Sequence, residues 1–218
     1  MSLKHQIARK EIIDASNLLI KNELVIGTWG NISVRIAGED LVAITPTGVD
    51  YDKLIPENIP IVDLEGNLID GNMIPSSEMP LHLEIYKSRL DVNAIIHTHS
   101  VHCTAMAIAR RPLPAVCEDL VQVAGGAVNV SEFRLPGATD FGQVVLNALK
   151  DRQAVLMANH GLLSVGMSLK ETLKTAMICE KSAQATLLAA NIGGAVEIDE
   201  SNWGYMRDYY LNKYGQKG

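Results

Sequence analysis

Residues 95–102 read Ile-Ile-His-Thr-His-Ser-Val-His, and this stretch decides how the rest of the chain is interpreted. The apolar residues before the histidines predict a strand over residues 92–98. Because side chains two apart in a strand share one face, His97 and His99 are expected to point the same way. Two imidazoles on one face make half of a metal site. An isolated pair of this kind is more often a packing feature, so its meaning depends on the other motifs.

Two residues elsewhere in the chain complete a candidate set of metal ligands. His160 follows another short apolar run, residues 154–157, and Glu78 comes directly after two serines. Zinc binds imidazole nitrogen and carboxylate oxygen, and a catalytic zinc keeps one position open, so three histidines and a glutamate suit such a site. The acid at position 78 has a second explanation, because a carboxylate in the first turn of a helix is stabilised by the helix dipole.

The composition limits the class of protein. The chain has 218 residues, of which 47% are hydrophobic and 20% are charged, and no linker divides it, so we expect one domain over residues 1–218. The formal net charge of −6 and the lack of a basic run argue against nucleic acid as a partner. No apolar stretch is long enough to cross a bilayer and no signal peptide is evident, so we expect a cytoplasmic protein without a membrane partner. Three cysteines without C-x-x-C spacing predict reduced thiols.

Hydrophobic periodicity predicts helices and strands along the whole chain. Ser168 and Glu171 form a capping-box pattern at the start of the longest helix. Glu180 falls on the apolar stripe of that helix, where it would either orient a metal-bound imidazole or reach past the edge of the core. The predicted helices span residues 3–22, 75–90, 101–109, 140–150 and 168–190. Residues 27–35 are predicted to form a turn that runs into a strand, and the other predicted strands span residues 41–44, 59–63, 68–69, 92–98, 154–157 and 162–165.

Two segments offer groups that bind phosphate. Ser76 and Ser77 open the predicted helix at residues 75–90, where free N–H groups and the helix dipole favour an anion. Thr47 and Gly48 follow the strand at residues 41–44 and offer a hydroxyl and a backbone amide. Helix capping alone would account for one serine, and an ordinary turn would account for the Thr-Gly pair.

Taken together, five motifs resemble the class II aldolase and epimerase family, which includes L-fuculose-1-phosphate aldolase and L-ribulose-5-phosphate 4-epimerase. They run over almost the whole chain in the family's order and at similar spacings. The motifs are Gly30-Asn31, Thr47-Gly48, Ser76-Ser77-Glu78, His97-Thr-His99 and Asn159-His160-Gly161. The resemblance implies an α/β fold of three layers, α/β/α, with a largely antiparallel central sheet. It also implies a homotetramer with active sites between subunits.

The resemblance assigns roles to the residues of these motifs. The three histidines would hold zinc, with manganese or cobalt as alternatives. Glu78 would ligate the metal in the absence of substrate and then move a proton on the substrate. The substrate phosphate would lie among Asn31, Thr47, Gly48, Ser76 and Ser77.

The implied reaction is zinc-dependent cleavage of a ketose 1-phosphate to dihydroxyacetone phosphate and an aldehyde. The substrate would be L-fuculose 1-phosphate or a compound of the 5-deoxypentulose 1-phosphate type. Family members use tyrosines for a second proton transfer, and Tyr214 resembles one of them. Glu118 and Asp119 stand where the other tyrosine is expected, so the group that moves this proton and the identity of the aldehyde are left open.

Two alternatives to an aldolase stay open. The first is an L-ribulose-5-phosphate 4-epimerase, which the acids at positions 118 and 119 favour. Epimerases of this family carry aspartate after the two serines, where this chain has Glu78, so the aldolase is preferred. The second is a non-catalytic oligomerising module similar to the adducin head domain, which lacks the metal ligands that this chain retains.

Overall fold

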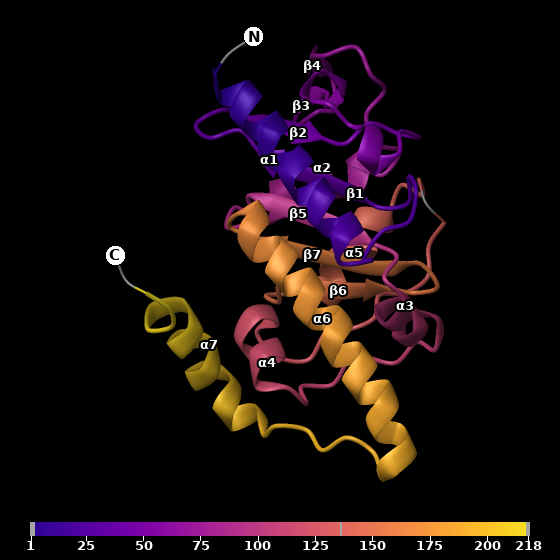
Figure 1. The fold of residues 1–218 in the computed structure, drawn as a ribbon, viewed down its shortest axis with the longest axis vertical. Coiled ribbons are helices and arrows are strands. Elements are labelled where there is room, and N and C mark those ends of the chain that lie inside the picture. The colour runs from indigo at the N-terminus through magenta and orange to yellow at the C-terminus, as the bar shows by residue number, and fades with distance from the viewer. Residues whose placement is uncertain (1–2, 136, 217–218) are drawn as a thin grey trace.

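A single antiparallel sheet lies at the centre of the molecule (Figure 1). The structure is a computed structural model and describes residues 3–135 and 137–216. The strands are β1 (Asn31–Arg35), β2 (Leu41–Ile44), β3 (Ile61–Asp63), β4 (Leu68–Asp70), β5 (Ala94–Thr98), β6 (Ala154–Met157) and β7 (Gly161–Gly166). They lie in the order β4-β3-β2-β1-β5-β7-β6, and each neighbouring pair is antiparallel. The antiparallel sheet predicted from the sequence is confirmed.

Helices cover both faces of this sheet. The α-helices are α1 (Leu3–Lys21), α2 (Met79–Ser88), α3 (Val101–Ile108), α4 (Glu118–Ala124), α5 (Phe141–Leu149), α6 (Leu169–Ala189) and α7 (Trp203–Asn212), and short 3-10 helices span Tyr51–Lys53, Pro56–Asn58, Ala190–Ile192 and Glu200–Asn202. Apolar side chains of α1, α3 and α6 form one buried cluster with the sheet. Those of α2 and α5 form a second cluster, which contains the neighbouring strand residue Ile95, whereas Ile96 belongs to the first. Alternate residues of β5 therefore face opposite layers, and the α/β/α architecture is confirmed.

α2 begins later than the sequence pattern predicts. The pattern starts this helix at Pro75, but its first helical residue is Met79. The residues before it pair with an extended segment instead. The Ser76 N–H donates to the Thr45 carbonyl at 3.0 Å, and Pro46 and Pro75 form an antiparallel bridge. Because this pairing holds residues 74–76 extended, Ser76 lies outside the helix and Ser77 falls in the turn that leads into it.

The helices α4 and α7 do not appear in the sequence prediction. α4 is short and ends where Gly125 adopts a left-handed conformation with φ of 88°. α7 contains no buried residue, so its sequence lacks the apolar stripe by which helices are recognised. It packs beside α4, and Arg207 donates to the Gln122 and Val123 carbonyls at 2.6 and 3.0 Å. The tyrosine-rich tail thus docks on its own domain. Within the described residues, no helix is long and apolar enough to cross a membrane.

Candidate metal centre and active site

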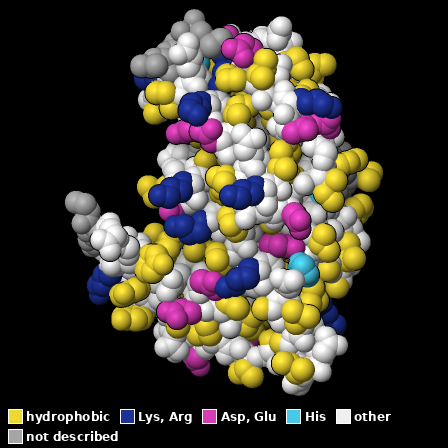
Figure 2. All heavy atoms as spheres, in the orientation of Figure 1, with side chains coloured by type: hydrophobic (Ala, Val, Ile, Leu, Met, Phe, Trp, Pro, Cys, Tyr) yellow, Lys and Arg dark blue, Asp and Glu magenta, His cyan; other side chains and the backbone are white. Residues whose placement is uncertain are grey.

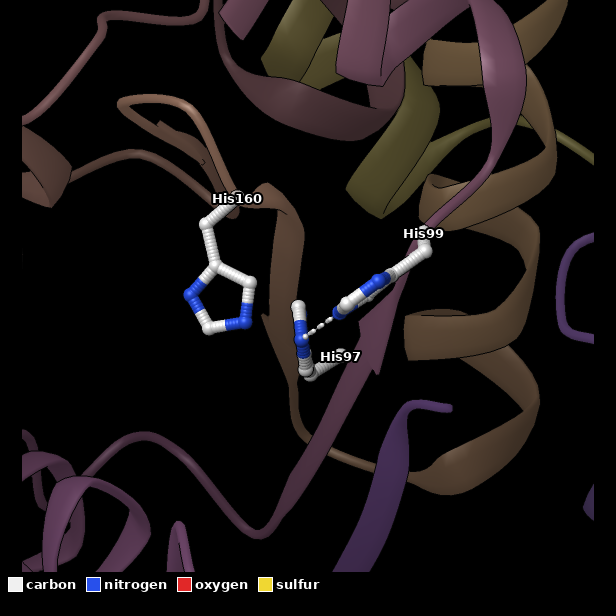
Figure 3. Close-up of side chains that lie close together, drawn as sticks. All are labelled: His97, His99 and His160. Carbon is white, nitrogen blue, oxygen red and sulfur yellow. Dashed lines mark hydrogen bonds between the residues drawn. The ribbon is translucent and has the colours of Figure 1, made fainter. Parts of the chain in front are cut away.

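Three histidines converge where β5 ends and β7 begins. The antiparallel pairing of these strands places His97 opposite Leu163 and Thr98 opposite Leu162, so the end of β5 lies beside the turn that carries His160. Figure 3 shows the side chains of His97, His99 and His160 pointing toward one another. One ring nitrogen of each lies within 4.8 Å of the others. Residues far apart in the sequence are therefore close enough to share one ion.

The turn before β7 approaches β5 closely and requires glycine. The His160 N–H donates to the Met157 carbonyl at 3.0 Å, which closes a tight turn, and Asn159 within it has a positive φ of 57°. A Cβ atom on Gly161 would lie 2.4 Å from the Thr98 carbonyl oxygen. Any side chain there would push the turn, and with it His160, away from β5.

Glu78 lies against two of the three histidines. Its Oε2 is 3.5 Å from Nε2 of His97, and its Oε1 is 3.2 Å from Nε2 of His160. Asn31 stands opposite His97 in the sheet and donates its amide N–H to Oε2 of Glu78 at 2.7 Å. Burial raises the pKa of this carboxyl, but the two imidazoles and the amide outweigh it and hold the pKa below its usual value. Glu78 is therefore a carboxylate at neutral pH.

The histidines fit a zinc ion in both charge and orientation. Burial lowers the pKa of His99 and of His160 to about 4, so both rings are neutral at pH 7 and can donate a lone pair to a metal. The Leu162 carbonyl accepts the Nδ1–H of His97 at 2.9 Å, which leaves Nε2 of this ring directed into the cluster. Imidazole nitrogen and carboxylate oxygen are the donors that zinc takes in catalytic sites, and this cluster offers both.

The segments expected to bind phosphate lie side by side next to Glu78. Thr47 donates its N–H to the Ile74 carbonyl at 3.0 Å, so the loop with Thr47 and Gly48 runs along the segment with the two serines. The Ser76 hydroxyl accepts the N–H of Glu78 at 3.3 Å. Asn31 joins the group through its bond to Glu78. The structure thus brings the five residues expected around a phosphate to one edge of the histidine cluster.

Three other predicted residues lie elsewhere in this chain. Glu118 accepts a hydrogen bond from Gln122 at 3.0 Å, within α4. Asp119 pairs with Lys181 of α6. Tyr214 lines a cavity of about 290 Å³ together with the residues at the C-terminal end of β7, whereas His160 precedes the first residue of that strand. The contacts found for these three residues in the described part of the chain are thus with groups other than the three histidines.

Glu180 does not orient a metal ligand, which corrects one of the two roles considered for it. Its Oε1 accepts the N–H of His102 and its Oε2 accepts the N–H of Cys103, both at 2.9 Å. These are unbonded amides of the first turn of α3, and a carboxylate is stabilised there by hydrogen bonds and by the helix dipole. Glu180 also lies 2.7 Å from Nδ1 of His102, outside the cluster.

Two aromatic side chains beside the cluster were not recognised from the sequence. The Phe141 ring stacks on His160 with centroids 6.2 Å apart, and the Trp29 ring lies 5.8 Å from that of His99. Phe141 stands at the start of α5, and no local pattern connects it with a histidine nearby in space. Trp29 stands in the turn before Asn31 and is exposed. The sequence signal that could have pointed to it is a large aromatic residue within a glycine-rich turn.

The comparisons with known proteins agree with this geometry. The family model described as Class II Aldolase and Adducin N-terminal domain matches residues 10–187. A 5-deoxy-D-ribulose 1-phosphate aldolase of Bacillus thuringiensis serovar kurstaki is 36% identical, with 86% of this chain and 88% of the relative covered. A probable L-ribulose-5-phosphate 4-epimerase of Mycoplasma pneumoniae is 32% identical, with coverages of 95% and 91%. A solved L-fuculose 1-phosphate aldolase superposes with a TM-score of 0.90 at 34% identity, over 94% of this chain and 96% of that one.

The chain therefore belongs to the class II aldolase and adducin N-terminal domain family, and the resemblance found in the sequence is confirmed. Enzymes of the class II aldolase type depend on a metal, which agrees with the histidine cluster.

Proposed function

We propose that this protein is a zinc-dependent aldolase that cleaves a ketose 1-phosphate into dihydroxyacetone phosphate and an aldehyde. The observation that carries the proposal is the position of Glu78, which contacts two of the three histidines and borders the paired segments suited to phosphate. Its relatives support the same chemistry, since they include aldolases named for L-fuculose phosphate and for 5-deoxy-D-ribulose 1-phosphate.

Each group in the site has a task in this reaction. His97, His99 and His160 would hold zinc, which supplies Lewis-acid stabilisation to the substrate oxygens that gain negative charge. In cleavage the C3–C4 bond breaks, the C4 hydroxyl loses its proton to become the aldehyde, and the electron pair stays on C3. Glu78 in its protonated form then delivers a proton to C3, which completes dihydroxyacetone phosphate. In the condensation direction the carboxylate removes that same proton, and its lowered pKa keeps it ionised for this step.

Phosphate binding would fix the substrate relative to Glu78. The hydroxyls of Thr47, Ser76 and Ser77 and the backbone amide of Gly48 can donate hydrogen bonds to phosphate oxygens. Since the Ser76 hydroxyl already contacts the Glu78 N–H, the phosphate and the proton-transfer group share one rigid segment. Such positioning supplies part of the rate enhancement.

The second proton would be moved by a residue of another subunit. Within the described residues, no hydrogen bond, ion pair or ring contact joins Tyr214, Glu118 or Asp119 to the three histidines. We therefore propose the homotetramer that the family resemblance implies, in which one chain completes the active site of its neighbour. The cytoplasmic location expected from the sequence stays a prediction.

The second candidate function is a pentulose 5-phosphate 4-epimerase, which would break and re-form the same type of bond without releasing fragments. It is favoured by the relative named as a probable L-ribulose-5-phosphate 4-epimerase and by the acids at positions 118 and 119. A non-catalytic module is disfavoured because all three histidines and Glu78 converge in one place.

A coupled assay for dihydroxyacetone phosphate separates these functions. Metal-reconstituted protein is offered a panel of ketose 1-phosphates, with L-ribulose 5-phosphate beside them. Release from at least one 1-phosphate is expected, and the panel then ranks the aldehydes. If ribulose 5-phosphate is converted to xylulose 5-phosphate and nothing is released from the 1-phosphates, the protein is an epimerase.

The role of Glu78 is tested by Glu78→Gln, which keeps the shape of the side chain but cannot exchange a proton. We expect the fold to be retained while the exchange of the C3 proton of dihydroxyacetone phosphate with solvent slows by roughly 10²- to 10⁴-fold, the usual contribution of a general base. Glu57→Gln, at an exposed glutamate in the 3-10 helix at residues 56–58, serves as the control. Normal exchange in Glu78→Gln would contradict the proposed role.

A further inference from the structure

Trp29 is a large aromatic side chain held in an exposed position beside the histidine cluster. Its exposed fraction is 66%, and its ring centroid lies 5.8 Å from that of His99 at an interplanar angle of 35°. The Trp29 N–H donates to the Ile26 carbonyl at 3.2 Å, which closes a tight turn with Gly27 at its tip. The indole is thus presented to its surroundings by a hydrogen-bonded turn.

The turn that carries Trp29 is attached to both halves of the proposed site. On one side, a Cβ atom at Gly30 would lie 2.7 Å from the His97 carbonyl oxygen, so the turn rests on the strand that carries two ligands. On the other side, the Gly27 carbonyl accepts the N–H of Tyr51, three residues after the Thr47-Gly48 pair. The turn that carries Trp29 is therefore joined to the strand end with the histidines and to the segment that follows the Thr47-Gly48 pair.

The other sides of the cluster already have neighbours. Glu78 contacts His97 and His160, and Phe141 stacks on His160. Among the residues that the structure describes, no ion pair joins Glu78 to His99. The Trp29 ring borders the cluster at His99.

We infer that Trp29 contacts the carbon chain of the bound sugar phosphate, in its dihydroxyacetone phosphate half, at the edge of the site formed by His99. This inference rests on the proposed function. A molecule that is held by its phosphate beside Thr47 and Gly48 and reaches the histidines passes the indole. The indole face packs against C–H groups, while the hydroxyl groups stay directed toward polar partners. Trp29 is thus a residue that contacts substrate and fixes the conformation of its chain.

Fluorescence provides a test that does not depend on catalysis, because the chain has two tryptophans. Trp203 lies on α7, where its Nε1–H donates to the Ile198 carbonyl at 3.0 Å, so Trp203→Phe leaves Trp29 as the reporter. Zinc-loaded Trp203→Phe protein is titrated with dihydroxyacetone phosphate. We expect the emission of Trp29 to shift to shorter wavelength and to become protected from acrylamide, since the ligand covers the indole.

Binding by variants completes the test. We expect Trp29→Ala to raise the dissociation constant of dihydroxyacetone phosphate roughly fivefold, as the loss of an aromatic contact would, while zinc content is unchanged. Trp29→Phe should recover part of this loss. The matched control is Ile26→Ala, since Ile26 is an exposed apolar residue of the same turn.

The outcomes separate this inference from the proposed function. If the unmodified protein releases dihydroxyacetone phosphate while neither Trp29 emission nor the affinity of Trp29→Ala changes, the inference fails alone. If Trp29→Ala instead alters the size of the assembly, Trp29 is a subunit contact and the inference is overturned. If the unmodified protein releases no dihydroxyacetone phosphate from any ketose 1-phosphate, the proposed function is wrong, and the inference about Trp29 is overturned with it.

Discussion

His99 is the residue on which the metal centre can be tested most directly. Its ring is neutral at pH 7, and its Nε2 lies 2.9 Å from Nε2 of His97. We expect His99→Ala to lose zinc and activity together, because the remaining ligands leave the shell incomplete. His102→Ala is the control, since this histidine bonds to Glu180 outside the cluster and should keep zinc. Zinc retained at full occupancy in His99→Ala would remove this residue from the site.

At the scale of single residues, sequence spacing was enough to pick out the candidate ligands but not the side chains that surround them. His97 and His99 were identified because a strand places alternate side chains on one face, and that rule is local. Phe141 and Trp29 reach the same place through turns and helix packing, for which the chain carries no periodic signal. The helix that carries Glu180 was predicted correctly, but the partners of this residue are backbone amides of α3, a neighbouring helix in the same layer, and the sequence does not indicate that contact.

At the scale of elements, α3 begins directly after the proposed metal ligands, and its first turn is held by α6. Glu180 of α6 accepts hydrogen bonds from the N–H groups of His102 and Cys103. We expect Glu180→Ala to lower the free energy of unfolding by about 1–3 kcal/mol, because both amides lose a partner. Glu180→Gln should lose less, and both variants should retain zinc. Loss of zinc with unchanged stability would instead support the role of orienting a metal-bound imidazole.

The packing of α2 on β1 makes stability depend on pH. His82 of α2 is fully buried, with Nδ1 2.6 Å from the Ser33 hydroxyl, and burial lowers its pKa from 6.5 to about 3. The unfolded chain therefore binds a proton as the pH falls through 6.5, while the folded chain does not bind it until about pH 3. Stability is full above pH 6.5 and falls below it, by up to ~1.4 kcal/mol per pH unit.

Denaturant unfolding of the metal-free protein between pH 7 and acid conditions measures this slope. His82→Gln should unfold with a shallower pH dependence, because the titrating group is gone. An identical slope in the variant and the unmodified protein would show that His82 is not the source.

The elements themselves were predictable where a periodic pattern had one explanation. The long helix α6 was recognised from its capping box, and the Ser168 hydroxyl does accept the Glu171 N–H at 3.3 Å. The start of α2 was placed wrongly because serines before an apolar run indicate a helix cap locally, whereas residues 74–76 pair with residues 45–47 and are held extended. That pairing is a long-range contact, and local propensity does not contain it.

At the scale of the whole molecule, α7 stands at the side of the domain with an exposed apolar surface. Figure 2 shows hydrophobic side chains gathered over this helix, on the left of the view, and they include Tyr205, Tyr209 and Leu211. Tyr214, just beyond the helix, is also exposed. A surface of this kind suits burial against a second copy, which agrees with the proposed assembly.

Mixing of two variants tests whether a site is shared between subunits. His99→Ala and Tyr214→Phe should each lose most activity alone. When the subunits exchange at equal amounts, about one quarter of the sites pair an intact His99 with an intact Tyr214 from a neighbour, so activity should return in proportion. No recovery would mean that both residues act from the same chain. Full activity of Tyr214→Phe alone would mean that Glu118 or Asp119, and not Tyr214, transfers the second proton.

The junction of β5 and β7 has a consequence for folding. The proposed metal ligands come from segments far apart in the chain. Two of them lie at the end of the inner strand β5, and the third lies in the turn of the hairpin formed by β6 and β7 at the edge of the sheet. An ion held by them acts as a cross-link between these parts, and it binds only when the sheet is assembled. By mass action the melting temperature should then rise with the concentration of free zinc, by RT ln(1 + [Zn]/Kd) in free energy. The ion proposed for catalysis would then also stabilise the folded sheet.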